Sequence, residues 1–235
     1  MSKLVQLVND FIARVHRPEV WSDVDGVHTS GSGGVTLCDV VAPDGMLLNG
    51  FFEVSVDSHG NEMSSRLLVP CDVNGKPEQD SVMAISTYGD TNLTPGDVNF
   101  ELYKFFPPDG KVIEYLREQE IRVCLISGRN SACVADRARK LDAESYLGEK
   151  DKLKRILALS EVPLSDIIFF GDHIQDVEAM LAIKEAGGLT VAPADATPEA
   201  HNAATYISTR NGGEGVLAEF FQVYLKERGW WPDGY

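Results

Sequence analysis

From Asp109 to its C-terminus the chain alternates between amphipathic helix patterns and short apolar runs, and this alternation restricts the fold more than any other feature. Short apolar runs bounded by turn residues are typical of buried strands. Strands separated by helices form parallel sheets that are covered by helices on both faces. We therefore expect an α/β fold. The expected strands are Ile121–Ile126, a short one around Tyr146, Ile167–Phe170, Leu189–Ala192 and Tyr206–Ser208, and the expected helices are Lys111–Gln119, Ser131–Leu141, Lys150–Leu159, Val177–Ala186 and Gly215–Glu227.

The region 35–106 differs from the rest of the chain. It contains strand-like runs, such as Phe51–Val56, Ser81–Ser86 and Val98–Leu102, and the segments between them are rich in Gly, Pro, Asn and Asp. Such turn signals between strand-like runs predict antiparallel hairpins. We expect a β-hairpin-rich insertion at 35–106 that serves as a cap or oligomerisation module. The core would then consist of residues 1–34 and 107–235.

Composition excludes several classes of function. The net charge of −15 argues against a broad basic surface for nucleic acid. No apolar run approaches the roughly 20 residues of a membrane helix.

The segment Met1–Val15 is predicted to be an amphipathic helix, with Leu4, Leu7, Val8 and Phe11 on one face. Cysteine spacing without any CxxC pair indicates reduced thiols in a cytoplasmic protein; the cysteines are Cys38, Cys71, Cys124 and Cys133.

Two carboxylates two residues apart, Asp23 and Asp25, follow the strand-like segment Glu19–Ser22 and precede Gly26. Glycine lets the chain turn directly after the strand. A carboxylate at this position can attack phosphorus, and a second one can protonate the leaving alcohol and then activate water. The alternative is a surface turn with two solvated acids. The motifs further along the chain favour the catalytic interpretation.

Asp23, Ser127 and Asp172 each come at the end of an expected strand. Ligands of open α/β sheets bind at the carboxyl ends of the strands, so we expect these side chains to meet at one edge. Asp172 and Asp176 would form a dense acidic cluster with Asp23, which is costly without a cation. The hard, oxygen-seeking ion Mg²⁺ fits such a cluster. Helix capping by Asp172 is the alternative, and it explains only one of the acids.

Ser127 and Lys152 are the candidates for contacts with a phosphoryl group. A hydroxyl and backbone N–H groups after Ile126 can hold phosphoryl oxygens, and an ammonium group can neutralise the charge of the transition state. A simple turn and a solvated helix face are the alternatives. Arg129 and Arg137 offer bidentate groups for a substrate carboxylate, or pair with surface acids. The glycine-rich segment Gly212–Gly215 lacks the Lys-Ser/Thr of a P-loop, so helix initiation or close packing explains it better.

The ordered motifs resemble those of the haloacid dehalogenase superfamily, and in particular its 3-deoxy-D-manno-octulosonate 8-phosphate and acylneuraminate 9-phosphate phosphatases. The resemblance covers roughly Trp21–Thr29 and Phe105–Phe221. The matching segments are Asp23–Thr29, Phe106–Gly110, Leu125–Ser131 with Arg137, Ala138 and Leu141, Tyr146–Leu153, Gly171–Asp176, Val191–Ala196 and Gly212–Val216.

The resemblance implies a Rossmann-like core, a covalent aspartyl-phosphate, Mg²⁺ dependence and a homotetramer. It implies that Asp23 is the nucleophile and Asp25 the acid and base, that Ser127 and Lys152 contact phosphate, and that the metal ligands come from Asp23, Asp25, Asp172 and Asp176. Thr29, Gly128, Arg129 and Arg137 are the candidates for substrate binding. This chain departs from the family at His28, Ser30 and His173, which replace the usual Leu, Asp and Asp, and its region after the first motif is much longer.

We therefore expect a Mg²⁺-dependent phosphomonoesterase that acts on a phosphorylated small molecule, a keto-sugar acid phosphate. The alternatives are another sugar phosphate or a nucleotide as substrate, and a non-catalytic subunit that retains the fold. We also expect a homo-oligomer. Its interfaces would involve the apolar insertion and the aromatic end Gly229–Tyr235, although these aromatics could instead pack on their own subunit.

Overall fold

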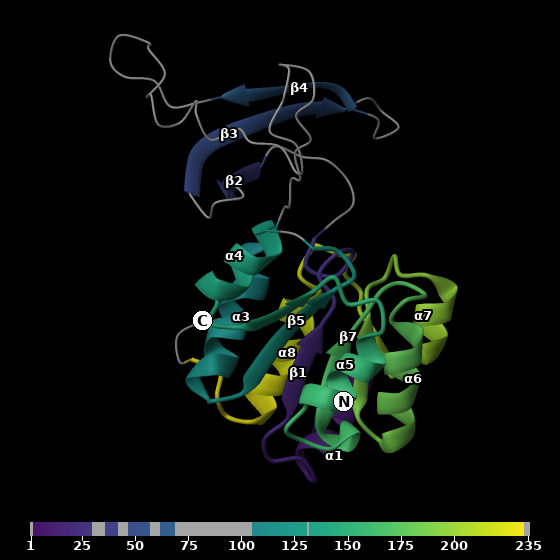
Figure 1. Cartoon of the computed structure of the whole chain (residues 1–235). Coiled ribbons are helices and arrows are strands. Elements are labelled where there is room, and N and C mark those ends of the chain that lie inside the picture. Colours follow the sequence, from purple (N-terminus) through teal and green to yellow (C-terminus); the bar gives the residue numbers. More distant parts are fainter. Residues whose placement is uncertain are drawn as a thin grey trace. The chain divides into compact units, whose positions relative to one another are not determined.

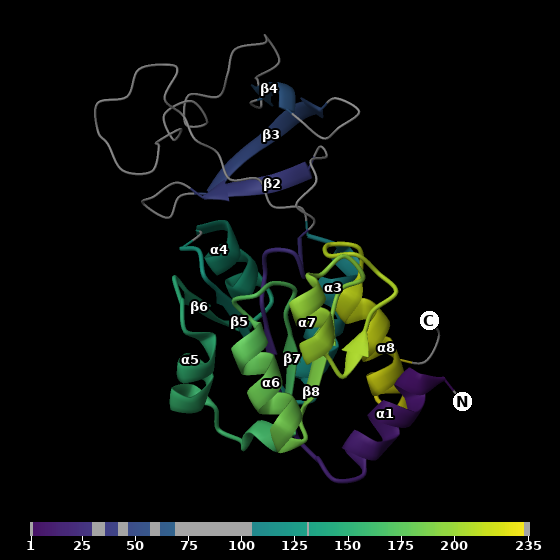
Figure 2. The same cartoon turned by 90° about the vertical axis from the view of Figure 1, so that its right-hand side faces the viewer.

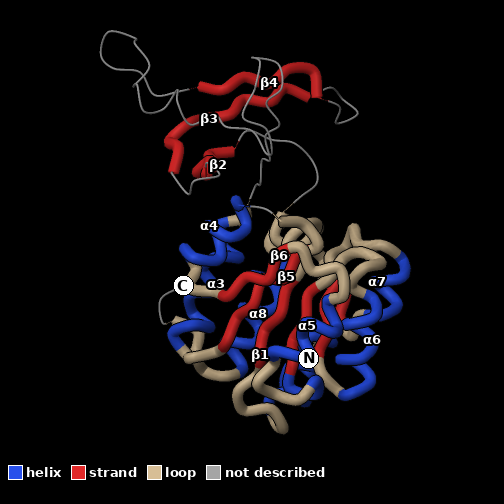
Figure 3. The backbone as a smooth tube through the Cα atoms, viewed as in Figure 1, coloured by secondary structure: helices blue, strands red, loops and turns tan. Residues whose placement is uncertain are grey.

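The larger sheet has six strands, all parallel, in the order β6-β5-β1-β7-β8-β9 (Figures 1 and 3). The computed structural model describes residues 2–29, 36–41, 47–56, 62–68, 105–130 and 132–232. The fold class expected from the alternating pattern is confirmed. The strands are β1 (Glu19–Ser22), β5 (Arg122–Ser127), β6 (Glu144–Leu147), β7 (Ile167–Phe170), β8 (Leu189–Ala192) and β9 (Tyr206–Ile207).

The helices follow the predicted periodic segments closely. They are α1 (Lys3–Ile12), α3 (Pro107–Glu118), α4 (Ala132–Lys140), α5 (Lys152–Leu159), α6 (Val177–Ala186), α7 (Pro198–Ala203) and α8 (Val216–Glu227), with a short 3₁₀ turn at Leu164–Asp166. The sequence analysis missed α7. Its signal is local: Thr197 caps the helix by accepting a hydrogen bond from the Ala200 amide, and Pro198 occupies the first helical turn.

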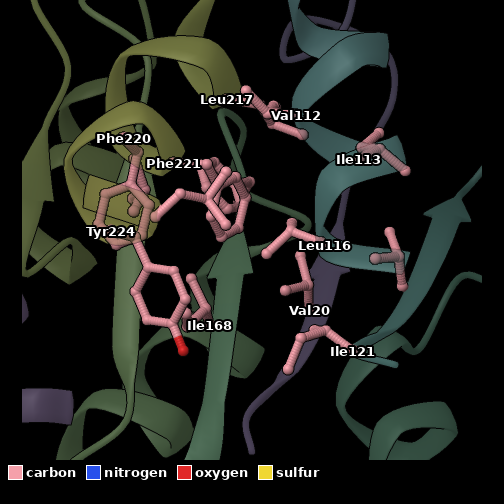
Figure 4. Close-up of a cluster of buried hydrophobic side chains, with 14 of the residues drawn as sticks. Val20, Val112, Ile113, Leu116, Ile121, Ile168, Leu217, Phe220, Phe221 and Tyr224 are labelled. Atoms are coloured by element: carbon pink, nitrogen blue, oxygen red, sulfur yellow. The ribbon is translucent and has the colours of Figure 1, made fainter. Parts of the chain in front are cut away.

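Both faces of the parallel sheet are buried. Consecutive strand residues point to opposite sides: Val20 and Phe170 belong to one core, whereas Trp21 and Phe169 belong to the other. The first core is closed by α1, α3 and α8, and the second by α5, α6 and α7. Figure 4 shows side chains of α3 and α8 in the first core, and Figure 2 shows α6 and α7 on one side of the sheet and α8 and α1 on the other. Burial on both faces explains why β5 and β7 contain continuous apolar runs.

The strand order places a topological switch point at the middle of this sheet. From β1 the chain proceeds outward through β5 to β6, then returns to the other side of β1 and continues through β7, β8 and β9. The connections after the neighbouring strands β1 and β7 therefore leave the sheet in opposite directions, and open α/β sheets bind their ligands at the carboxyl ends of such strands. The segments that follow β1, β5 and β7 border this position.

The described residues fall into two compact units. The first contains the parallel sheet and its helices, except for the part of α4 before Ala138. The second takes its described residues from Ser32–Lys104 and Ser131–Arg137, and includes an antiparallel sheet of β2 (Thr36–Val41), β3 (Leu47–Val56) and β4 (Glu62–Leu68) in the order β2-β3-β4. The expected antiparallel pairing is thus present among the described residues 36–41, 47–56 and 62–68. The strand-like runs Ser81–Ser86 and Val98–Leu102 lie outside the described residues, and the domain boundaries at 34 and 106 stay a prediction.

Helix α1 and the tryptophans that follow α8 pack on the first core. Leu4, Val8 and Phe11 of α1 are buried, as the amphipathic pattern predicts. Trp230 and Trp231 also pack against this core, with the Trp231 ring edge-on to Tyr115 at 5.9 Å between centroids. Both tryptophans therefore contact their own subunit, Tyr235 lies outside the described residues, and the role of this segment in an interface stays a prediction. No helix among the described residues is long and apolar enough to cross a membrane.

Candidate active site

Asp23 and Asp25 lie in a tight turn directly after β1. The Asp23 amide donates to the Phe170 carbonyl of β7 at 2.8 Å, which continues the strand pairing by one residue. The amides of His28 and Thr29 then bond back to the Val24 carbonyl at 3.0 and 3.3 Å, while Gly26 turns the chain with a φ of +77°. A left-handed φ of this size is open to glycine at little cost. We call residues 23–29 the catalytic loop.

Lys152 lies between two carboxylates. Its Nζ atom is 2.8 Å from Asp23 Oδ1 and 2.6 Å from Asp176 Oδ1, and the Lys152 side chain is 2% exposed. The lysine is the first residue of α5, which Asp151 caps by accepting from the Lys154 amide at 2.9 Å. Burial alone would lower the pKa of Lys152, but the facing carboxylates of Asp23 and Asp176 raise it overall, so the lysine is held as an ammonium ion.

Asp172 completes an acidic cluster. Carboxylate oxygens of Asp23, Asp172 and Asp176 lie within 4.8 Å of one another. Burial raises the pKa of Asp23 well above its usual range, Asp176 raises it further, and Lys152 opposes both. Burial and Asp176 likewise raise the pKa of Asp172 to about 6. Lys152 cannot balance three ionised carboxylates alone, so the cluster holds excess negative charge.

The donors fit a divalent cation. Asp172 Oδ1 is buried and lacks a hydrogen-bond partner among the residues that the structure describes. Asp176 is more fully engaged, because Oδ1 accepts from Lys152 and Oδ2 accepts from the amides of Asp172 and His173 at 3.1 Å each. An uncompensated carboxylate oxygen beside two further acids is the environment that a hard cation relieves.

Helix capping by Asp172 is the alternative to metal binding that the sequence left open. Asp176, not Asp172, is the N-terminal cap residue of α6, and Asp172 lies in the turn that precedes it. The backbone amides of Asp172 and His173 both donate to the Asp176 carboxylate, which holds this turn against the start of α6. Helix capping therefore does not explain why Asp172 is an acid.

Ser127 contacts the second carboxylate of the catalytic loop, Asp25. It ends β5, is fully buried, donates to Asp25 Oδ2 at 3.2 Å and accepts from the Arg129 amide at 3.0 Å. The Ser127 carbonyl accepts from the Glu149 amide at 3.0 Å, which ties this turn to the segment before α5. The structure thus brings together Asp23, Asp25, Ser127, Lys152, Asp172 and Asp176, as the sequence predicted for one sheet edge.

The four candidates for substrate binding have different surroundings. Thr29 is buried and its hydroxyl donates to the Val24 carbonyl at 3.4 Å, so it supports the catalytic loop. Gly128 and the exposed Arg129 follow Ser127 directly. Arg137 belongs to the second unit, and its role stays a prediction.

The two histidines inside the motifs also differ. His28 is buried, and its Nε2 atom lies 3.1 Å from Ser22 Oγ, which itself donates to the Asp23 carbonyl at 2.8 Å. His173 is exposed in the turn after Asp172. His28 therefore contacts Ser22, whose hydroxyl binds the backbone of Asp23. Sequence spacing alone could not reveal this contact.

Sequence comparisons identify the family to which the protein belongs. A family model described as haloacid dehalogenase-like hydrolase matches residues 150–220. The chain belongs to this family of hydrolases and is a phosphatase. It is 32% identical over 164 residues to the 3-deoxy-D-manno-octulosonate 8-phosphate phosphatase KdsC of Yersinia pestis, covering 68% of this chain and 79% of that protein. The corresponding protein of Escherichia coli K12 is 30% identical over 168 residues, covering 68% and 87%.

Solved structures agree on the fold. A hypothetical protein of Xanthomonas campestris superposes with a TM-score of 0.60 and 22% identity, covering 98% of this chain and 90% of that one. The 3-deoxy-D-manno-octulosonate 8-phosphate phosphatase of Moraxella catarrhalis, solved with magnesium, phosphate and the sugar acid, gives a TM-score of 0.57 at 20% identity, covering 96% and 92%. These likenesses establish the shared architecture.

Proposed function

We propose that this phosphatase is a Mg²⁺-dependent phosphomonoesterase of a keto-sugar acid phosphate, such as 3-deoxy-D-manno-octulosonate 8-phosphate, and that it works through an aspartyl-phosphate on Asp23. The observation that carries the proposal is the buried contact of Lys152 with Asp23 beside Asp172, at the switch point of the sheet. The curated relatives of 30–32% identity support the substrate class.

In the first half-reaction, an oxygen of ionised Asp23 attacks phosphorus, and the bond between phosphorus and the ester oxygen breaks. Asp25 gives its proton to the leaving alkoxide, so the alcohol departs neutral. Lys152 opposes the rise in the pKa of Asp23 that burial and Asp176 cause, which favours the ionised nucleophile, and its charge would offset that of the phosphoryl oxygens. Ser127 Oγ, which donates to Asp25 in the free protein, is placed to turn toward a phosphoryl oxygen.

In the second half-reaction, Asp25 accepts a proton from water, and the oxygen of that water attacks the phosphorus of the aspartyl-phosphate. The bond between phosphorus and Asp23 then breaks, which releases inorganic phosphate and restores both carboxyl groups. We propose that Asp23 and Asp172 would hold Mg²⁺, with Asp25 contributing from the catalytic loop, while Asp176 orients Lys152. The bound cation would neutralise charge on the phosphoryl group.

Arg129 follows Ser127 by two residues, and we propose that its guanidinium group recognises the carboxylate of the sugar acid. We further infer a cytoplasmic homo-oligomer, as the reduced cysteines and the apolar insertion suggest. Cys124, for example, is a buried free thiol.

Release of inorganic phosphate from a panel of sugar acid phosphates, neutral sugar phosphates and nucleotides tests the proposal. We expect turnover that needs Mg²⁺, is lost in excess EDTA, and is highest for a sugar acid phosphate. Asp23→Asn should lower kcat by at least about 10⁴-fold, because the nucleophile is removed. Turnover that favours nucleotides would overturn the substrate class. A protein inactive on the whole panel would favour the non-catalytic alternative.

A further inference from the structure

The glycine-rich segment before α8 packs directly against the back of the catalytic loop. We call residues 211–213 the glycine turn. The Gly213 amide donates to the Val27 carbonyl at 2.9 Å. A Cβ atom on Gly212 would overlap the Gly26 carbonyl group, and a Cβ atom on Gly26 would overlap the Asp172 carboxylate. Three layers are therefore stacked without room for a side chain: the glycine turn, the catalytic loop and Asp172.

The glycine turn is itself fixed from behind. Asp195 Oδ1, in the loop after β8, accepts from the Gly212 amide at 2.8 Å. The Ala194 amide donates to the Arg210 carbonyl, also at 2.8 Å. On the other flank, Glu219 of α8 accepts from the Ser208 hydroxyl at 2.6 Å and from the Thr209 amide at 3.1 Å. Hydrogen bonds on both sides of the glycine turn therefore fix its position relative to Gly26.

We propose that the glycine turn positions the catalytic loop for phosphoryl transfer, with Gly212 acting through the Gly26 backbone and Asp195 holding Gly212 in place. The inference rests on the proposed phosphatase function and extends it to residues outside the catalytic cluster. The turn sets how closely the loop that carries Asp23 and Asp25 approaches Asp172. A misplacement of about 1 Å at a reacting group can cost on the order of 10²-fold in rate.

Gly212→Ala tests the proposal, and Gly188→Ala is its matched control. Neither glycine has a left-handed φ, so alanine is compatible with the backbone φ at both positions, and any strain comes from the overlap of its Cβ atom. A Cβ atom at Gly188 would overlap the Leu164 carbonyl oxygen, but Gly188 precedes β8 at the opposite edge of the sheet from the site. Both variants should lose stability, since each forces a backbone shift.

We expect Gly212→Ala to lower kcat by at least about tenfold, with little change in KM, and to reduce the rise in Tm on adding Mg²⁺. Gly188→Ala should keep the wild-type kcat per folded molecule and the full Mg²⁺ shift, with folding checked by circular dichroism. Wild-type kcat in Gly212→Ala, or an equal loss in both variants, would overturn the proposal.

A second pair covers the case in which Gly212→Ala does not fold. Asp195→Ala removes the acceptor of the Gly212 amide, whereas Asp195→Asn keeps an oxygen that can accept the same bond. A lower kcat in the alanine variant that asparagine restores supports the proposal, and equal activity in the two contradicts it. If the wild-type protein hydrolyses no phosphomonoester, the proposed function fails. The rise in Tm on adding Mg²⁺, compared between Gly212→Ala and Gly188→Ala, then tests by itself whether the glycine turn positions the catalytic loop.

Discussion

Lys152 is the residue on which the charge balance of the site depends. It contacts Asp23 and Asp176, both almost fully buried. Removing one partner of a buried ion pair leaves an uncompensated charge, which typically costs about 3–5 kcal/mol. Lys152→Met should therefore lower the free energy of unfolding by about this amount without Mg²⁺, as measured by urea denaturation. Lys154→Met, on the exposed face of the same helix, is the control. Equal stability of the two variants would contradict the assigned charge balance.

Asp172 predicts a pH dependence of stability. Its pKa is raised to about 6 in the folded protein, mainly by burial and by Asp176. The folded state therefore holds a proton that the unfolded state releases nearer pH 4, so stability should fall as pH rises from about 4 to above 6. Asp23, whose pKa is also raised, adds to the same trend.

Thermal unfolding in EDTA between pH 4.5 and 7.5 measures this trend. Asp172→Asn should flatten the slope, because the amide does not titrate, and Mg²⁺ should offset the loss at high pH by binding the ionised carboxylates. Asp10→Asn, on the exposed face of α1, should leave the slope unchanged. A slope that Asp172→Asn leaves intact would show that this cluster is not its source.

At the scale of elements, α8 begins without a capping side chain of its own. Gly215 is its N-terminal cap residue, and the cap is supplied by Asp109 of α3, whose Oδ1 accepts from the Ala218 amide at 2.7 Å. Asp109→Ala should lower the free energy of unfolding by about 1–2 kcal/mol, and Asp109→Asn should lose less because its oxygen can still accept the bond. Chemical denaturation measures both. No loss in the alanine variant would refute the cap.

How much was predictable differs between elements. Strand β7 and helix α6 were predicted with correct ends, because a buried apolar run marks the strand and a terminal glycine marks the end of the helix. The gathering of Asp23, Ser127 and Asp172 was also predictable, since parallel strands bring their carboxyl ends together. The role of Gly212 was not, because its contact with Gly26 joins segments far apart in the chain and no local pattern encodes it.

At the scale of the whole molecule, the antiparallel sheet at 36–68 distinguishes this chain from a bare hydrolase core. We predict that the protein is a homo-oligomer, most simply a tetramer, in which the insertion lies near a neighbouring active site. Its apolar strands supply surface that association can bury. Light scattering at micromolar concentration should give a mass several times that of one chain. A fully active monomer would refute a role of neighbouring subunits.

Asp23 as the covalent nucleophile is the central claim, and trapping of the intermediate tests it most directly. The enzyme is mixed with its sugar acid phosphate and Mg²⁺, quenched during turnover and reduced with borohydride, which converts an acyl-phosphate of aspartate to homoserine. Peptide mass spectrometry should then find homoserine at position 23, only when substrate is present. Homoserine at another aspartate, or rapid turnover with Asp23 unmodified in every quench, would contradict the account.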